Sequence, residues 1–98
     1  MDIQITARHS KASADLQARL TDELSALEKF NDKITSCHVI LDSENENKTV
    51  EITMHVQAHQ LSANAKAENL GKAIDEAVAK IEVQLKKIKE KVKEHHNR

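Results

Sequence analysis

Lysines gather in the last part of the chain, where the stretch QLKKIKEKVKEHHNR carries six positive and two negative side chains. Lys80, Lys87 and Lys91 are spaced seven and four residues apart, which would place them along one side of a helix. Such a row of ammonium groups can follow a phosphate backbone. The same charges also suit the solvated end of a helix, since cations near a helix C-terminus favour the macrodipole. Charge alone leaves both interpretations open.

Histidines are the other residues that invite a chemical interpretation. They are His9, His38, His55, His59, His95 and His96. They show no HExxH pattern and no tight spacing with cysteines, so we expect no metal site and rank a metal-dependent activity last. The sequence has no glycine-rich phosphate loop, nucleophile elbow or paired carboxylates on an identifiable cleft, so we expect neither an enzyme nor a cofactor. The single Cys37 is predicted to be a small buried apolar residue.

Alternating apolar and polar residues predict four strands. The first contains Ile3, Ile5 and Ala7, and the second runs from Cys37 to about Asp42. A polar turn is expected over residues 42–48, and the third strand then covers residues 50–58. A short turn at residues 59–60 leads to a fourth strand, which turns Leu61, Ala63 and Ala65 inward.

Two segments follow the helical period instead. Leu16, Leu20, Leu24 and Leu27 recur every three or four residues behind a capping Ser13, which predicts a helix that ends near Phe30. A second, longer helix is expected from about residue 68 to 95. Its apolar stripe consists of Ile74, Val78, Ile81, Leu85, Ile88 and Val92. At 1.5 Å per residue, this helix is longer than a four-stranded sheet is wide, so it should overhang the sheet from about residue 88 onward.

The predicted order is therefore β-α-β-β-β-α, an α+β fold with a four-stranded mixed sheet and both helices on one face. The first helix connects two parallel strands, and the later strands pair as antiparallel hairpins. The opposite sheet face should be polar. Its expected members are Gln4, Thr6, Arg8, His38, Asp42, Glu51, Thr53, His55, Gln57 and Lys66. This face has no aromatic residue on which a base could stack, since the only aromatic, Phe30, lies at a helix end. Any RNA binding should therefore use shape and backbone contacts.

Composition limits the protein to a few classes. The 98 residues fit one domain over residues 1–98, with no proline and a single glycine to mark a linker. No apolar run is long enough to span a membrane and the N-terminus does not resemble a signal peptide, so we expect a cytoplasmic protein. The formal net charge is −1, so a nucleic-acid contact would depend on an uneven distribution of charge.

At this point the chain resembles the ribosome hibernation promoting factor and protein Y family, also called ribosome-associated inhibitors or sigma-54 modulation proteins. The resemblance covers nearly the whole chain. It rests on IQITARH, LEKF, VEITMHV, AID and KIEVQLKKIK, in that order. It implies a fold related to double-stranded-RNA-binding domains and a short-type member that binds small-subunit rRNA in the decoding channel. There it would block mRNA and tRNA and inhibit translation in stationary phase or stress.

The resemblance also implies which residues make contact. Basic side chains fall on basic or plausible contact positions of the family: Arg8, Lys29, Lys80, Lys87, Lys89 and Lys91. Lys86 is less typical of the family and is a further candidate contact. The chain departs from the family pattern at Asn69-Leu70-Gly71, where Asp-Met-Tyr is common, and at Val83, where arginine is usual. These departures would remove two rRNA contacts, for which Lys86 could compensate.

Partners follow from the same resemblance. Besides the small ribosomal subunit, a ribosome modulation factor is a candidate, because some family members act with one to favour ribosome dimers while others hold single ribosomes idle. We expect the free protein to be a monomer. The alternative is a protein–protein interaction module that uses Ile88 and Val92 of the overhanging helix, and a stable dimer of the free protein would favour it.

Overall fold

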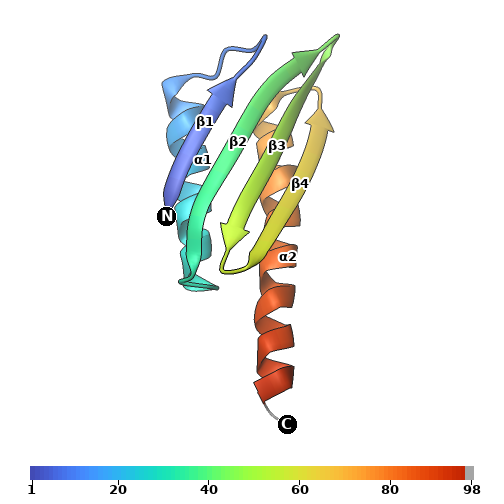
Figure 1. Cartoon of the computed structure of the whole chain (residues 1–98). Helices are drawn as coiled ribbons and strands as arrows, with labels where there is room; N and C mark the ends of the chain where they lie inside the picture. Colours follow the sequence, from blue (N-terminus) through green and yellow to red (C-terminus); the bar gives the residue numbers. More distant parts are fainter. Residues whose placement is uncertain (97–98) are drawn as a thin grey trace.

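The computed structural model describes the backbone of residues 1–96 and the side chains of residues 1–88. The chain forms β1 (Asp2–Ala7), α1 (Ala14–Ala26), a 3₁₀ turn (Leu27–Lys29), β2 (Ile34–Glu44), β3 (Asn47–Val56), β4 (His59–Ala67) and α2 (Leu70–His96). Figure 1 shows a twisted sheet with its strands side by side in chain order and α2 continuing past the end of the sheet. The predicted element order is confirmed.

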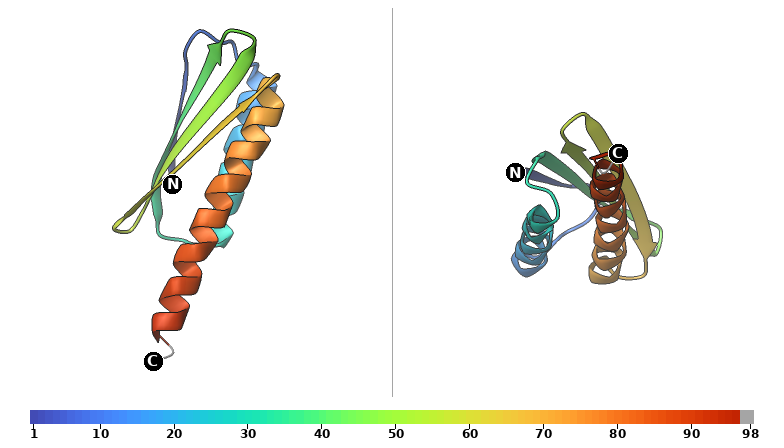
Figure 2. Two further views of the ribbon diagram at one scale, coloured as in Figure 1. Left: turned by 90° about the vertical axis from the view of Figure 1, so that its right-hand side faces the viewer. Right: turned by 90° about the horizontal axis from the view of Figure 1, so that it is seen from below.

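The pairing of the strands is also as predicted. β1 lies parallel to β2, while β2–β3 and β3–β4 are antiparallel. Both helices cover the same face of the sheet, as the view from below in Figure 2 shows. Within residues 1–96, no helix is both long and apolar enough to cross a membrane.

Two predicted turns are wrong in position. Residues 42–48 were expected to form a polar turn, but β2 and β3 stay paired as far as Glu44 and Asn47, so the turn contains only residues 45–46. The β3–β4 turn lies at residues 57–58 and not at 59–60, because Val56 pairs with His59. Gln57 is therefore a turn residue and does not belong to the open sheet face. Polar side chains on the outer face of a hairpin look like turn residues in a sequence, since only pairing distinguishes them.

Both helices begin at polar capping residues. The Ser13 hydroxyl accepts a hydrogen bond from the Leu16 N–H at 3.1 Å, as the sequence predicted. The Asn69 side chain accepts one from the Lys72 N–H at 2.8 Å, so α2 begins at Leu70, slightly later than expected. The departure from the family pattern at Asn69 thus provides a helix cap.

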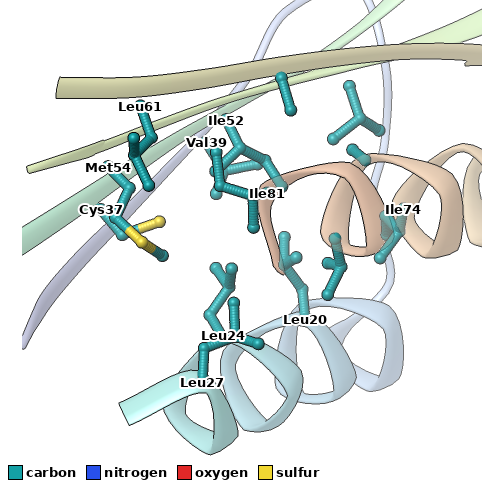
Figure 3. Packing of buried hydrophobic residues seen from close by; sticks show 14 of the residues in the cluster. Leu20, Leu24, Leu27, Cys37, Val39, Ile52, Met54, Leu61, Ile74 and Ile81 are labelled. Atoms are coloured by element: carbon teal, nitrogen blue, oxygen red, sulfur yellow. The ribbon is translucent and has the colours of Figure 1, made fainter. Parts of the chain in front are cut away.

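The core lies between the sheet and the two helices. Figure 3 shows Leu20, Leu24 and Leu27 from the α1 side meeting Ile74 and Ile81 of α2 beneath the strands. The strand residues of this core are Ile34, Cys37, Val39, Leu41, Val50, Ile52, Met54, Val56, Leu61, Ala63 and Ala65. The buried position predicted for Cys37 is confirmed, and burial raises the pKa of its thiol to about 11.

One residue of the expected helix overhang belongs to this core. Ile88 is only 9% exposed and is part of the core cluster, so the expectation that its side chain is free to recruit a partner is wrong. Val92 lies outside the described side chains. In the described part of α2, the large apolar residue that faces solvent is Val83, which is 53% exposed.

Candidate nucleic-acid interface

The predicted contact residues with described side chains do not form one stripe. Arg8 at the end of β1 and Lys80 on α2 border the same shallow hollow over the outer ends of β2, β3 and β4. Lys66 of β4 lines it as well, and we call Arg8, Lys66 and Lys80 the sheet-side group. The sequence placed Lys66 on the open face but did not single it out as a contact residue. The outward position of Lys66 in the predicted fourth strand could have indicated it as a contact residue.

Each member of the sheet-side group is held by a contact near the edge of the sheet. The Arg8 N–H donates to the Leu41 carbonyl at 2.7 Å, which fixes the backbone of Arg8 beside β2. The Lys80 ammonium donates to the Asn64 carbonyl at 2.7 Å. The Lys66 ammonium lies 3.7 Å from a Glu44 carboxylate oxygen.

Carboxylates line the same hollow, so it is not a purely positive surface. The acidic residues around it are Asp42, Glu44 and Glu51. An ammonium ion carries three donors, so Lys80 keeps two N–H groups for a phosphate oxygen while it bonds to Asn64. The hollow can therefore accept an anion beside Lys80, whereas its carboxylates repel one.

A second group forms on the helical side of the molecule. The Lys29 and Lys86 ammonium nitrogens lie 5.2 and 4.8 Å from the centroid of the Phe30 ring, and we call these two lysines the Phe30 group. A cation over an aromatic face is attracted by the negative charge of the ring face. Lys86 also pairs with Glu82 one helical turn earlier, at 3.1 Å. Both lysines are exposed, so Phe30 holds two cations together at the surface.

The remaining predicted contacts lie on α2. Lys87 is exposed and, at seven residues from Lys80, shares a flank of the helix with it. Lys89 and Lys91 belong to α2 by their backbone, but their side chains lie outside the described residues. In the Phe30 group, Lys86 projects from another flank of α2, toward Phe30 and the 3₁₀ turn that carries Lys29. The cations thus face more than one direction.

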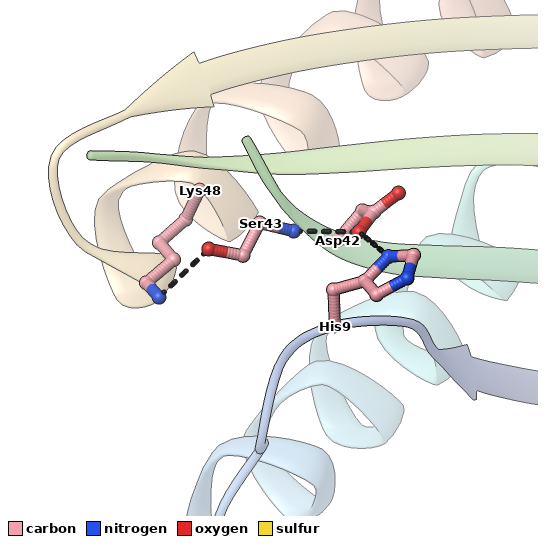
Figure 4. Close-up of polar contacts among 4 residues, drawn as sticks. All are labelled: His9, Asp42, Ser43 and Lys48. Atoms are coloured by element: carbon pink, nitrogen blue, oxygen red, sulfur yellow. Dashed lines mark hydrogen bonds and ion pairs between the residues drawn. The ribbon is translucent and has the colours of Figure 1, made fainter. Parts of the chain in front are cut away.

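A polar network joins the end of β1 to the β2–β3 hairpin, as Figure 4 shows. His9 Nδ1 lies 3.2 Å from an Asp42 carboxylate oxygen, which also accepts the Ser43 N–H at 2.7 Å. The Ser43 hydroxyl accepts a hydrogen bond from the Lys48 ammonium at 3.1 Å. The Ser43 N–H, and secondarily His9, hold the pKa of Asp42 below its ordinary value. This network fixes the loop that follows Arg8.

The histidines of the sheet make other contacts. His38 Nε2 lies 3.1 Å from the Thr6 hydroxyl on the neighbouring strand, consistent with the predicted polar face. Among the described side chains, no three histidine, cysteine, aspartate or glutamate residues are arranged so as to hold a metal ion.

Comparison with known proteins identifies the family. The model described as "Sigma 54 modulation protein / S30EA ribosomal protein" matches residues 3–93. A relative from Pseudomonas putida, named ribosome hibernation promoting factor, is 34% identical over 93% of this chain and 89% of its own length. The protein of the same name from Escherichia coli strain K12 is 30% identical over 97% of this chain and its whole length.

Solved structures agree in fold. A ribosomal subunit interface protein from Coxiella burnetii has a TM-score of 0.85 at 26% identity, covering 91% of this chain and 98% of that one. The N-terminal domain of Thermus thermophilus Protein Y has a TM-score of 0.82 at 21% identity, covering 90% and 99%. The resemblance detected in the sequence is confirmed. The chain belongs to the sigma 54 modulation protein / S30EA ribosomal protein family.

Proposed function

We propose that this protein is a ribosome hibernation factor of the cytoplasm that binds the small ribosomal subunit in its decoding channel. There it blocks mRNA and tRNA and so inhibits translation in stationary phase or stress, without catalysing a reaction. The observation that carries the proposal is the family match over residues 3–93, together with relatives of nearly equal length that are named hibernation promoting factors. A ribosome modulation factor is a candidate second partner.

The distribution of the cations supports a binding site that encloses the protein. The sheet-side group and the Phe30 group project from different sides of one domain, and Lys87 adds a further exposed charge. A flat RNA surface could engage only one of these groups at a time. The walls of an RNA channel can engage them together, and the elongated domain, 50 Å in its longest dimension, would then occupy the path of mRNA and tRNA.

The form of recognition follows from what the surface lacks. Phe30, the single aromatic residue, is half-buried and flanked by Lys29 and Lys86, and the open sheet face carries polar side chains. Bases splayed from a single strand would therefore find no phenylalanine, tyrosine or tryptophan ring on that face to stack against. We infer that the protein binds the phosphates of folded rRNA through Arg8, Lys29, Lys80, Lys86, Lys87, Lys89 and Lys91.

Co-sedimentation of the purified protein with small ribosomal subunits tests the proposal. The protein should bind at low salt and release steeply as salt rises, because each phosphate contact adds about 0.9 to the slope of log affinity against log salt. A Lys80→Ala/Lys87→Ala variant should bind more weakly, and the slope of its log affinity against log salt should be smaller in magnitude by up to about 2. The four-lysine variant that also changes Lys89 and Lys91 should lose more.

A matched control removes the same charge elsewhere. Lys11 and Lys72 are exposed lysines outside both groups, so Lys11→Ala/Lys72→Ala should bind like the unchanged protein. Binding that ignores salt, or that both double variants weaken equally, would contradict phosphate contacts by Lys80 and Lys87. Failure of the unchanged protein to bind small subunits would overturn the proposal and favour a protein–protein interaction module.

A further inference from the structure

The outer edge of β4 has no strand partner, and α2 packs along it. β4 is the last strand of the sheet and pairs only with β3, so the other side of its backbone has no strand partner (Figure 1). Such an edge offers a row of N–H and C=O groups to any extended chain that approaches it. Edges of this kind are commonly blocked by proline, a bulge, charged side chains or a covering helix. β4 has no proline and no bulge over His59–Ala67, and Lys66 is the one lysine or acidic residue that it carries.

Two side chains of α2 bond to this edge instead. The Gln84 amide nitrogen donates to the Ser62 carbonyl at 2.7 Å, and the Gln84 amide oxygen accepts from the Ser62 N–H at 3.3 Å. These are the two bonds that a residue of an adjoining antiparallel strand would exchange with Ser62. The Lys80 ammonium donates to the Asn64 carbonyl, the next outward-facing carbonyl along the strand.

The fit depends on the spacing of both elements. Residues four apart on a helix are about 6 Å apart along its axis, and residues two apart on a strand are separated by about 6.8 Å. Gln84 and Lys80 therefore meet Ser62 and Asn64 in order, as α2 runs back along β4. Two side chains thus occupy three backbone groups of the edge.

We propose that the outer edge of β4 is a strand-pairing surface for a second copy of this chain, and that Gln84 and Lys80 keep it closed in the monomer. This inference does not depend on ribosome binding.

The sequence of β4 indicates a second copy as the occupant because the strand complements itself. An antiparallel pair of β4 strands centred on Ala63 places Ser62 opposite Asn64 and Lys66 opposite Gln60, so no like charges face each other. The inward residues of the two strands would also stay on one face of a continuous sheet, because opposed residues in an antiparallel pair point the same way.

The test is the mass of the free protein as a function of concentration. The unchanged protein should sediment as a monomer of 11.0 kDa. Gln84→Ala should move the average mass toward twice that value, and adding Lys80→Met should make dimers form at lower concentration. Lys72→Ala, at an exposed position of α2 outside the hollow that Ser62, Val83 and Gln84 line beside the edge, should stay monomeric. A Gln84→Ala protein that remains monomeric at every concentration would overturn the proposal.

Ser62→Pro gives a second check in the Gln84→Ala background. The Ser62 N–H points away from β3, so proline there removes a donor that the sheet does not use, and it should restore the monomer. A dimer that survives Ser62→Pro would show that β4 is not the contact.

Hydrogen exchange of the unchanged protein tests the closed edge without any variant. The Ser62 amide should exchange about tenfold more slowly than an amide that faces water, which is the effect expected of one hydrogen bond. Exchange of Ser62 at the unprotected rate would refute the cap that the proposal requires. All three measurements use the free protein, so a negative result would leave the ribosome proposal unaffected. Failure to bind small subunits would likewise leave the proposal for the β4 edge unaffected.

Discussion

Gln57 occupies the β3–β4 turn with a left-handed backbone, and replacing it with glycine should stabilise the protein. Its φ is 54°, a region where the Cβ of an ordinary residue crowds the following carbonyl at a cost of about 1–2 kcal/mol. Glycine avoids that contact but orders at a larger loss of backbone entropy, about 0.5–1 kcal/mol. The Gln57 N–H donates to the Lys33 carbonyl at 3.3 Å, and Gln57→Gly keeps that donor.

The net gain should be about 0.5–1 kcal/mol in the free energy of unfolding. For a domain of this size, this corresponds to a rise in Tm of about 2–8 °C. Urea unfolding followed by circular dichroism measures the change, and the slope against urea concentration should be unaltered because the folded contacts are the same.

Two controls separate backbone strain from side-chain effects. Gln57→Ala keeps the Cβ, so its free energy of unfolding should not rise as that of Gln57→Gly does. Asn45→Gly changes a residue with φ of 57°, but asparagine tolerates this region through its short polar side chain, so the gain should be smaller than at Gln57. Equal stability of Gln57→Gly and Gln57→Ala would refute the assignment of strain to this turn.

Three further predictions follow from burial and from the two pKa shifts. The pKa of Asp42 is lowered chiefly by the Ser43 N–H, so its carboxylate stabilises the fold at neutral pH and loses that contribution as the pH falls through the lowered value. In Asp42→Asn, the free energy of unfolding measured with urea should therefore fall less between about pH 5 and pH 2 than in the unchanged protein. The Cys37 thiol, with a pKa raised to about 11, should react with a thiol reagent at pH 8 at least about 100-fold faster in the unfolded chain, and equal rates would contradict its burial. Ile81→Ala should lower the free energy of unfolding by about 2–5 kcal/mol because Ile81 is fully buried, whereas Val83→Ala on the exposed side of the same helix should change it by less than about 0.5 kcal/mol.

The candidate site was only partly predictable. The spacing of Lys80 and Lys87 placed them on one flank of a helix, and both residues lie within α2, where residues seven apart share a flank. Lys29 and Lys86 were predicted separately, and nothing in their spacing showed that both would lie over Phe30. Such meetings depend on how α1 and α2 pack, and side-chain periodicity contains no information on packing between distant segments.

The order of the elements, their inward faces and the Ser13 cap could be derived from the sequence, because each depends on residues two to four positions apart. Only the tertiary structure decided where the strands end, since the outward polar residues near Glu44 and His59 are turn-like until a partner strand bonds to them. It also decided that Gln84 closes the β4 edge. A glutamine on a helix forms two backbone hydrogen bonds to a strand only when sheet and helix have packed at the distance that their buried side chains set.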